Sequence, residues 1–327
     1  MSQDPPAITV VIPTRNRGAL IAETIQSLRR VEYPAFAVLV VDQSTDARTR
    51  EAVQAAAAGD QRFRVESTST VGSSAARNLG AHLATTPIVA FTDDDCIVAP
   101  AWLAALAEEF ETCETAAVYG RLVPYETEVR TGTEVGFKAA ADRTEYERRT
   151  PPWHIGHGGN MSFRRDELLA VGGFDPLLGA GGRFGACEDP DIAYRLLAAG
   201  RRVVYSSAAV VRHKHWKDWR AQKRMERAYG IGAGAQFAKY LRAGDRYGLR
   251  LFATWFWQLG VRRVGAGLLK WRSTRPMYLG YCQLVYPWIG VLRSLTARVD
   301  AERMVYVESS LGSRAHVPPG RGRGAGP

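Results

Sequence analysis

Residues 88–95 read Ile88-Val89-Ala90-Phe91-Thr92-Asp93-Asp94-Asp95, a short apolar run followed directly by three carboxylates. The apolar part predicts a buried strand of an α/β sheet, and ligands bind beyond the ends of such strands. Carboxylates this close repel each other and raise one another's pKa unless a positive charge lies between them. The run therefore indicates a divalent cation on oxygen ligands, shared with the phosphates of a nucleotide. A solvated acidic turn is the alternative that this stretch alone leaves open.

Strand-like and helix-like runs alternate through the first 120 residues. Continuous apolar, β-branched runs predict strands that are buried on both faces of a sheet, and they occupy residues 8–12, 37–41 and, more weakly, 63–65. Apolar residues at helical spacing follow at 20–28, 51–58 and 72–84. Pro100 suits the first turn of a further helix. This order predicts an α/β fold with a mostly parallel central sheet and a ligand at the C-terminal edge of that sheet.

Beyond residue 120 the pattern is less regular. Residues 121–157 have weak periodicity and predict a loop-rich segment over the site. A helix is expected over residues 190–199 and a strand over 202–205. Residues 216–300 contain long helical stretches rich in Arg, Trp and Tyr, and the Gly/Pro/Arg-rich tail at 309–327 is expected to be disordered.

Charge divides the chain into an acidic body and a basic appendage. Residues 1–211 hold 21 Lys and Arg and 27 Asp and Glu, a net charge of −6, whereas residues 212–327 hold 22 and 6, a net charge of +16. A basic appendage of this kind favours phosphate or anionic lipid as a partner.

Aromatic side chains are interleaved with the basic residues of the C-terminal region, at Trp216, Trp219, Trp255, Trp257, Trp271 and Trp288. This pattern suits a membrane surface at headgroup level, single-stranded nucleic acid, or a helical core with solvated basic faces. Two apolar runs, 251–261 and 278–292, are short for membrane spans, and Pro287 is expected to interrupt the second. We favour peripheral binding to an anionic membrane surface.

The N-terminus and the cysteines indicate the compartment. Residues 1–7 show neither the basic nor the apolar segment of a secretory signal. The four cysteines, Cys96, Cys113, Cys187 and Cys282, lack the spacing of a CxxC motif or a disulfide framework, which suits a reducing cytosol. A cytoplasmic protein is expected, placed on the inner face of the cell membrane if the C-terminal region binds lipid.

Polar residues also follow the first two predicted strands, as Pro13-Thr14-Arg15-Asn16 and as residues 42–46. Capping of the following helices by Asn16 and Asp46 is the simpler interpretation of each segment taken alone. Together with Arg77 and the aspartate run, these strand ends predict a converging site.

In order along the chain, residues 10–17, 40–46, 72–78 and 91–95 resemble the nucleotide-binding half of family 2 glycosyltransferases. Residues 158–163, 172–175 and 188–191 resemble the acceptor half of that family. The resemblance covers roughly residues 7–215. It implies the GT-A fold, a nucleotide-sugar-binding α/β sandwich, with a nucleotide half at 1–120, an acceptor half at 121–215, and the helical region at 216–308 appended to them.

The resemblance also implies the donor site. Asp93 and Asp95 correspond to the DxD pair, with Asp95 as the metal ligand and Asp93 shared between metal and ribose. His213, preferred to His215, closes the site around Mn²⁺ or Mg²⁺. The donor pocket would be lined by Pro13, Thr14, Arg15, Asp42, Gln43, Arg77, Asp93 and Asp94. Gln43 stands where many members have an Asp that binds uracil, so a strict uridine preference does not follow, and UDP and dTDP are both expected.

The catalytic residues come from the second acidic motif. Transfer to a hydroxyl needs a base for the acceptor proton, and the resemblance makes Asp189 that base, with Glu188 beside it. The Gly-rich loop 179–185 would move over bound donor. Capping of the 190–199 helix is the alternative role for Asp189. Gly159, Asn160 and Asp191 would contact the acceptor, a lipid-linked or polysaccharide glycan, and the sugar would be transferred with inversion.

Two other functions remain as alternatives. A nucleotidyltransferase that makes sugar nucleotides should show a GxGxR signature after the first strand, where this chain has Pro13-Thr14-Arg15-Asn16. A basic nucleic-acid-binding protein is favoured only by the C-terminal charge, and the acidic first half and the lack of RNA-binding motifs oppose it. We therefore expect no nucleic-acid partner.

Overall fold

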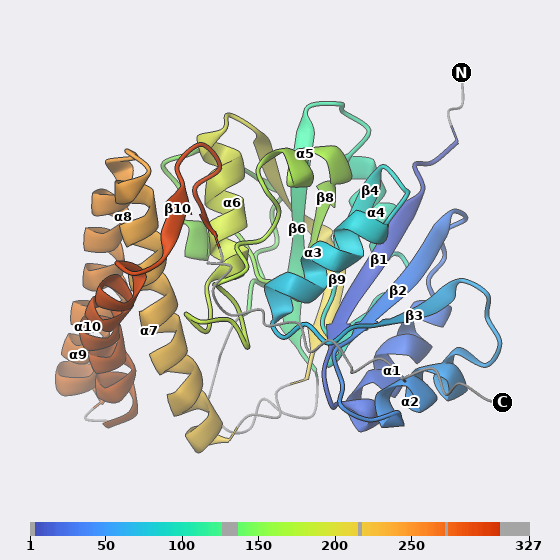
Figure 1. Cartoon of the computed structure of the whole chain (residues 1–327), viewed down its shortest axis with the longest axis horizontal. Coiled ribbons are helices and arrows are strands. Elements are labelled where there is room, and N and C mark those ends of the chain that lie inside the picture. The colour runs from blue at the N-terminus through green and yellow to red at the C-terminus, as the bar shows by residue number, and fades with distance from the viewer. Residues whose placement is uncertain (1–3, 126–136, 215–217, 272–273, 308–327) are drawn as a thin grey trace, which may run out of the picture.

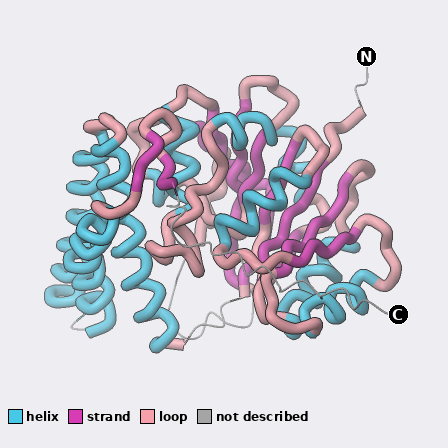
Figure 2. Tube along the Cα trace, in the orientation of Figure 1, coloured by secondary structure: helices cyan, strands magenta, loops and turns pink. Residues whose placement is uncertain are grey.

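Strands and helices alternate along the chain and are followed by a helical region (Figures 1 and 2). The computed structural model describes residues 4–125, 137–214, 218–271 and 274–307. The strands of the central sheet are β1 (Ile8–Thr14), β2 (Phe36–Asp42), β3 (Phe63–Ser67), β4 (Ile88–Phe91), β5 (Cys96–Val98), β6 (Thr115–Pro124), β7 (Thr144–Tyr146), β8 (Met161–Arg164) and β9 (Arg202–His213). The helices between them are α1 (Gly18–Arg29), α2 (Arg48–Ala57), α3 (Ser73–Leu83), α4 (Trp102–Glu109), η2 (Pro152–His154), α5 (Arg165–Ala170) and α6 (Glu188–Ala198).

The sheet has the order β3-β2-β1-β4-β8-β6-β9-β5, with β7 paired to β9. Strands β1, β2, β3, β4, β6 and β9 run in one direction, and β5, β7 and β8 run in the other. The predicted α/β fold with a mostly parallel sheet is therefore confirmed.

Continuous apolar strands are explained by cores on both faces of the sheet. In β1, Val10 and Ile12 face the core formed with α1, α2 and α4, whereas Val11 faces the core formed with α3, α5 and α6. All three side chains are fully buried. A parallel sheet covered by helices on both faces has this pattern of burial.

Two boundaries differ from the sequence prediction. The strand predicted at 202–205 continues to His213, because its pairing with β6 resumes after a register shift between Ser206 and Val210. Pro100 precedes α4, which begins at Trp102, instead of lying in its first turn. Residues 309–327, predicted to be disordered, lie outside the described residues.

The C-terminal region forms a layer of helices beside α6 (Figure 1). Its elements are α7 (Trp219–Arg242), α8 (Tyr247–Trp255), η3 (Phe256–Val261), α9 (Arg262–Ala266), η4 (Gly267–Trp271), α10 (Thr274–Ser294) and the hairpin β10 (Arg298–Asp300)–β11 (Val305–Val307). Helices α7 and α10 touch at glycines, since a Cβ on Gly234 would lie 1.8 Å from the carbonyl oxygen of Pro287. The expected interruption at Pro287 is wrong, because α10 is helical on both sides of this residue and the close contact with α7 stabilises it.

Buried charges join the helical layer to the body. Lys239 of α7 places its Nζ 2.6 Å from Asp175 Oδ2 and 2.7 Å from Asp191 Oδ1, and all three side chains are fully buried. Asp175 Oδ2 also accepts a hydrogen bond from the backbone N–H of Tyr306. Removing one partner of such a pair would leave an uncompensated buried charge, so these contacts hold the helices firmly to the acceptor half.

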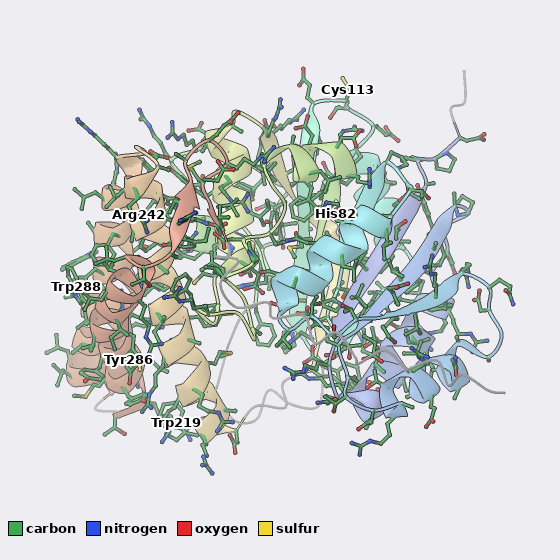
Figure 3. All side chains as sticks on the ribbon, in the orientation of Figure 1. His82, Cys113, Trp219, Arg242, Tyr286 and Trp288 are labelled. Atoms are coloured by element: carbon green, nitrogen blue, oxygen red, sulfur yellow. The ribbon has the colours of Figure 1, made fainter. Side chains whose placement is uncertain are left out.

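The tryptophans of the helical layer divide between core and surface. Trp255 is buried, whereas Trp257 and Trp288 are 59% and 52% exposed, and Trp288 points away from the body (Figure 3). Trp216 lies outside the described residues, and the side chain of Trp271 is not described. None of the helices described in the structure is both long and apolar enough to cross a membrane.

Candidate functional site

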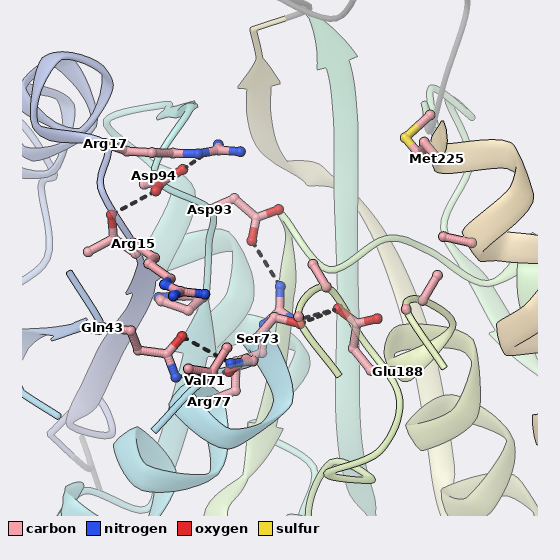
Figure 4. Close-up of a pocket in the computed structure, with 18 of the residues that line it drawn as sticks. Arg15, Arg17, Gln43, Val71, Ser73, Arg77, Asp93, Asp94, Glu188 and Met225 are labelled. Carbon is pink, nitrogen blue, oxygen red and sulfur yellow. Dashed lines mark hydrogen bonds and ion pairs between the residues drawn. The ribbon is translucent and has the colours of Figure 1, made fainter. Parts of the chain in front are cut away.

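A cavity of about 730 Å³ opens beyond the C-terminal ends of β1, β2 and β4 (Figure 4). Its size falls within the range of small-molecule sites. Strand ends, the first turns of α3, the acidic run and the Gly-rich loop supply its walls, and α7 closes one side. The lining residues include Pro13, Thr14, Arg15, Arg17, Gln43, Gly72, Ser73, Arg77, Asp93, Asp94, Asp95, Gly181, Glu188, His213, Arg224 and Tyr229.

The acidic run is held by contacts to the first strand and to α1. Thr14 Oγ1 donates a hydrogen bond to Asp94 Oδ2 over 2.7 Å. Arg17 Nη1 lies 2.9 Å from Asp94 Oδ1 and 3.1 Å from Asp95 Oδ2. Burial raises the pKa of Asp94 to about 6, and the neighbouring Asp95 adds to this effect while Arg17 opposes it. The acidic run is therefore held in place by hydrogen bonds and ion pairs, and it is not a solvated acidic turn.

Four side chains converge in a possible metal site: Asp93, Asp95, Cys96 and His213 bring ligand atoms within 4.8 Å of one another. The pairing of β5 with β9 creates this arrangement, because it places Cys96 opposite His213. His213 Nε2 lies 3.3 Å from Asp95 Oδ1, and its buried Nδ1 has no hydrogen-bond partner within the described part of the chain.

This donor set fits a divalent cation. Two carboxylates and one imidazole suit Mn²⁺, and the carboxylates also suit Mg²⁺. Cys96 offers a soft thiol, which suits Mn²⁺ or Mg²⁺ less well than the carboxylates do. His215 lies outside the described residues.

Arg77 connects the acidic run to the second acidic motif. This buried side chain donates from Nη2 to Asp93 Oδ1 over 2.9 Å and from Nη1 to Glu188 Oε1 over 2.8 Å. Ser73 Oγ donates to the same Glu188 oxygen over 3.0 Å. The guanidinium lies at the wall of the cavity and joins the two acidic motifs through these charge-assisted hydrogen bonds.

Gln43 and Asp42 brace the end of the second strand. Gln43 donates from Nε2 to the carbonyl of Gly72 over 3.1 Å and accepts from the N–H of Gly72 over 3.3 Å. Asp42, which is buried, accepts from the N–H of Ser44 and does not line the cavity. The cap positions of α1 and α2 belong to Arg17 and Ala47. Asp46 nevertheless caps α2 through its side chain, because its Oδ1 accepts a hydrogen bond from the N–H of Arg48 over 3.0 Å.

The Gly-rich loop lies against the N-terminus of α3. Gly179, Gly181 and Gly185 all have positive φ angles, between 81° and 90°, a conformation that glycine adopts without strain. Ser73 N–H donates to the carbonyl of Ala180 over 2.8 Å. A Cβ on Gly179 would come within 2.5 Å of Ser73 Oγ, so this contact requires glycine as well.

Asp189 follows Glu188 directly but is not among the residues that line the cavity. Its Oδ2 accepts a hydrogen bond from the N–H of Gly158 over 3.0 Å and lies 4.0 Å from His157 Nδ1. Burial and then the adjacent Glu188 raise the pKa of Asp189 to about 7. The capping alternative is wrong, because α6 begins at Glu188 and the residue before it, Cys187, takes the cap position with φ 76°.

Asp189 lines a second cavity of about 280 Å³ between the body and the helical layer. This smaller cavity has mixed walls. Its lining residues are Phe137, Trp153, His154, Gly156, His157, Cys187, Asp189, Pro190, Glu226, Tyr229, Trp255, Leu259, Arg263 and Gln283. Tyr229 lines both cavities, so the two spaces are neighbours.

The residues predicted to contact the acceptor lie elsewhere. Asn160 is buried and binds Trp102 Nε1 and the carbonyl of Ala209. Asp191 is buried between Lys239 and Arg195. Neither lines either cavity. Gly159 lies beside the acidic run, where a Cβ would be 3.3 Å from Asp93 Oδ2.

Sequence reasoning did not assign several lining residues. Arg17 follows the polar strand end within the same motif, and its position beside the acidic run could have suggested a role. Ser73 precedes Arg77 by one helical turn. Arg224, Tyr229 and Glu226 lie on α7, and no local pattern connects them with a site formed by the first half of the chain.

The fold and the cavity together define a nucleotide-sugar-binding α/β protein of the GT-A type. Residues 9–170 match the model of the family described as glycosyl transferase family 2, and the chain belongs to this family. A pre-mycofactocin glycosyltransferase of Mycobacterium tuberculosis is 30% identical over 66% of this chain and 45% of the relative. The chain thus spans less than half the length of that relative.

Further relatives and solved structures agree with this assignment. A glucosyl-dolichyl phosphate glucuronosyltransferase of Haloferax volcanii is 27% identical over 65% of this chain and 72% of the relative. The mannosyltransferase PcManGT of Pyrobaculum calidifontis, solved with GDP-Man and Mn²⁺, has a TM-score of 0.61 at 21% identity and covers 90% of this chain and 89% of its own. S. aureus TarS 1–349, solved with UDP-GlcNAc, has a TM-score of 0.54 at 14% identity, with coverage of 88% and 90%. At these identities the structures establish the fold alone.

Proposed function

We propose that the protein is a metal-dependent, inverting glycosyltransferase that moves a sugar from a nucleotide-sugar donor to a hydroxyl acceptor. One observation carries this proposal. Two consecutive residues at the start of α6 serve different cavities: Glu188 lines the large cavity that contains the acidic run, and Asp189 lines the small one. A donor diphosphate and an acceptor hydroxyl placed in these cavities would meet at this pair.

The large cavity is proposed to hold the donor. Arg15 and Arg77 would bind diphosphate oxygens, and the N-terminus of α3 adds backbone N–H groups beside them. Pro13 and Thr14 would shape the pocket for base and ribose, together with Asp93 and Asp94, and Asp42 would support this wall from behind it through the N–H of Ser44. The Nε2 and Oε1 atoms of Gln43 both bind Gly72. Oε1 has a second lone pair, which would accept a hydrogen bond from the nucleotide base. UDP and dTDP are the proposed nucleotides.

Asp95, Asp93 and His213 would hold Mn²⁺ or Mg²⁺. When bound, the ion would neutralise negative charge on the diphosphate leaving group. Arg77, which lies between Asp93 and Glu188, would also help to neutralise the negative charge of the diphosphate. These three ligands come from two segments that the β5–β9 pairing brings together, which is the support for a metal site here.

Asp189 is the proposed base. Its carboxylate would accept the proton of the acceptor hydroxyl as that oxygen forms a bond to the anomeric carbon. The bond from that carbon to the diphosphate oxygen breaks in the same step, and the nucleoside diphosphate departs. A single displacement of this kind inverts the anomeric configuration. The pKa of about 7 favours the role, because a general base works best when its pKa is near the operating pH.

The helical layer is proposed to bind an anionic membrane surface and to bring the enzyme to a lipid-linked or polysaccharide acceptor on its cytoplasmic side. Exposed apolar side chains and exposed arginines occur together on α8 to α10. The apolar ones are Leu249, Trp257, Leu268, Leu269, Trp288 and Leu292, and the arginines are Arg246, Arg250, Arg262 and Arg293. This combination is typical of interfacial helices. The name of the Haloferax relative also describes a lipid-linked substrate.

No observation favours either alternative. The family assignment speaks against a nucleotidyltransferase. The basic region contributes the carboxylate of Glu226 to a cavity that Asp189 of the body also lines, which speaks against a nucleic-acid-binding groove there.

The nucleotide and metal can be tested together by thermal unfolding of the full chain with UDP, dTDP, GDP or CDP, each with Mn²⁺, Mg²⁺ or EDTA. A ligand that binds only the native state raises the unfolding temperature. We expect UDP or dTDP with Mn²⁺ to give the largest shift and EDTA to abolish it. Equal shifts with and without metal would contradict the metal-dependent donor site.

A further inference from the structure

We propose that the small cavity, named here the ring pocket, binds a neutral sugar or other cyclic polyol whose hydroxyl is glycosylated, and that Glu226 selects this acceptor. The inference rests on the proposed function and adds the acceptor class and the residues that recognise it. The ring pocket consists of the residues given above for the 280 Å³ cavity. Its volume is at the small end of the range for ligand sites and suits one ring.

The position of the ring pocket points to the acceptor. Asp189 lies on the body side of the pocket, one residue from Glu188 in the donor cavity. Tyr229 lines both spaces. A hydroxyl in the ring pocket can therefore reach the proposed base while its ring remains outside the donor cavity.

Four elements of the helical layer contribute polar or aromatic groups to this pocket: Glu226 and Tyr229 from α7, Trp255 from α8, Arg263 from α9 and Gln283 from α10. Gln283 Nε2 donates to Glu226 Oε2 over 2.7 Å, and Trp255 Nε1 donates to Gln283 Oε1 over 3.2 Å. Arg263 Nη1 lies 3.6 Å from Glu226 Oε2. These contacts fix the groups in place at the wall of the cavity, where the carboxylate of Glu226 has further acceptor capacity for a ligand hydroxyl.

The walls indicate the shape of that ligand. Trp153 and Trp255 meet edge to face with ring centroids 5.0 Å apart, and Tyr229 adds a third aromatic surface. Flat aromatic walls with a few polar groups at one end are the usual construction of a small-molecule site. A cyclic polyol fits it, because such a ring has apolar C–H faces and hydroxyl groups on its edge.

Charge argues against a phosphate as the reacting group. Asp189 and Glu226 are both carboxyl groups of this pocket, and Arg263, which already faces Glu226, is the only Arg or Lys among the described lining residues. Burial raises the pKa of Glu226, and an added anion would have to be placed beside both groups. A hydroxyl-bearing neutral ring avoids this repulsion and can donate hydrogen bonds to Glu226.

The ring pocket continues into a groove of about 630 Å³ that shares His154, Leu259 and Arg263 with it. The groove extends along Arg262 to Leu269, whose side chain is 86% exposed. An acceptor longer than one ring would leave the pocket along this groove, toward the exposed apolar residues of the helical layer.

The test uses the full chain, sugar derivatives of the nucleotide identified by thermal unfolding as donors, and octyl glycosides of common neutral hexoses as acceptors. Three quantities are measured: transfer to each octyl hexoside, release of nucleotide without acceptor, and quenching of tryptophan fluorescence by the octyl hexosides. In the wild type we expect transfer to at least one octyl hexoside. The variant Glu226→Gln should raise the acceptor KM about 10-fold or more, because it removes hydrogen bonds to a charged group. Its nucleotide release should stay at the wild-type rate.

Two further variants guard against a purely structural effect. Leu259→Trp would fill the ring pocket while leaving Glu226 and Gln283 unchanged, and it should abolish transfer and retain nucleotide release. Glu145→Gln is the matched control and should change neither activity, since Glu145 of β7 is ion-paired with Arg202 of β9 and lies outside both cavities.

The outcomes separate this proposal from the proposed function. If the wild type releases no nucleotide from any donor, the proposal that the protein is a glycosyltransferase is wrong. If the wild type releases nucleotide, but no octyl hexoside accepts the sugar or quenches the tryptophan fluorescence, the ring-pocket proposal is wrong. Transfer to farnesyl phosphate in preference to every hexoside, or an unchanged acceptor KM in Glu226→Gln, would also overturn it.

Discussion

Arg77 Nη1 lies 2.8 Å from Glu188 Oε1, which ties the first turn of α6 to the α3 helix of the nucleotide half. The same guanidinium binds Asp93, so one buried side chain connects the acidic run to the proposed catalytic pair. The two motifs are far apart in sequence, and their spacing in the site depends on this bridge. Donor binding and the position of Asp189 should therefore be sensitive to the same residue.

Replacing Arg77 with Met should lower the free energy of unfolding by about 3 kcal/mol, because two partly buried carboxylates would lose their partner. Urea unfolding measures this change. Arg64→Met is the matched control: Arg64 also pairs with a carboxylate, Glu66, at 2.9 Å, but its side chain is 67% exposed. Surface pairs of this kind contribute about 0–1 kcal/mol. Equal losses in the two variants would contradict the bridging role.

Asp95→Asn should remove most of the metal-dependent affinity for the nucleotide while the protein stays folded. Asp95 belongs to the edge of the sheet and to the possible metal site, and amide substitution removes a charged oxygen ligand. Calorimetric titration of UDP with and without Mn²⁺ measures the change, and Asp142→Asn, at an exposed loop position, is the control. A variant that binds UDP and Mn²⁺ as tightly as the wild type would exclude Asp95 as a ligand.

Much of the nucleotide half was predictable because its signals are local. The β-branched run at 8–12 can be buried only inside a sheet, and Thr14, Gln43 and Asp93 lie at or within two residues of strand ends. The end of β9 was missed because its register shift after Ser206 depends on the partner strand. The start of α6 was missed because Cys187 takes a positive φ angle that the sequence Asp189-Pro190 does not suggest.

The acceptor side was much less predictable. Glu226, Trp255 and Gln283 come from three different helices, and only the packing of those helices brings them to Asp189. Asn160 and Asp191 belong to the motifs that resemble the family's acceptor half, yet their polar atoms bind Trp102, Ala209, Lys239 and Arg195. Sequence motifs mark positions where polar groups matter, and they do not distinguish a ligand contact from a buried support.

Substituting both Leu268 and Leu269 with Glu should weaken binding to vesicles that contain phosphatidylserine, since it replaces exposed apolar surface by negative charge. Point substitutions are preferable to truncation, because α10 packs tightly on α7. Vesicle sedimentation at increasing salt measures the effect, and wild-type binding should also fall as salt rises. Val71→Glu is the control, because Val71 is exposed at 49% but lies in the nucleotide half. Vesicle binding that is insensitive both to salt and to the double substitution would contradict a membrane-binding role for the helical layer.

The raised pKa of Asp189 predicts how the rate of sugar transfer depends on pH. With its pKa near 7, the carboxyl group is protonated at lower pH and cannot accept the acceptor proton, so kcat/KM should rise with pH and level off above about 7. Asp189→Asn keeps the oxygen that binds Gly158 N–H but removes the basicity. It should lower turnover about 10²-fold or more, abolish the rise with pH, and leave donor affinity nearly unchanged.

Stability provides an independent check on the same group. A folded-state pKa above the unfolded value means that the native state holds its proton more tightly, so the stability that Asp189 contributes at low pH is lost as pH rises to about 7. Asp189→Asn removes this loss, and relative to the wild type the variant should gain stability between about pH 5 and about pH 8. Urea unfolding at both pH values measures this gain. If Asp189→Asn turns over normally while Glu188→Gln is inactive, the base is Glu188. A product that keeps the anomeric configuration of the donor would exclude the single displacement.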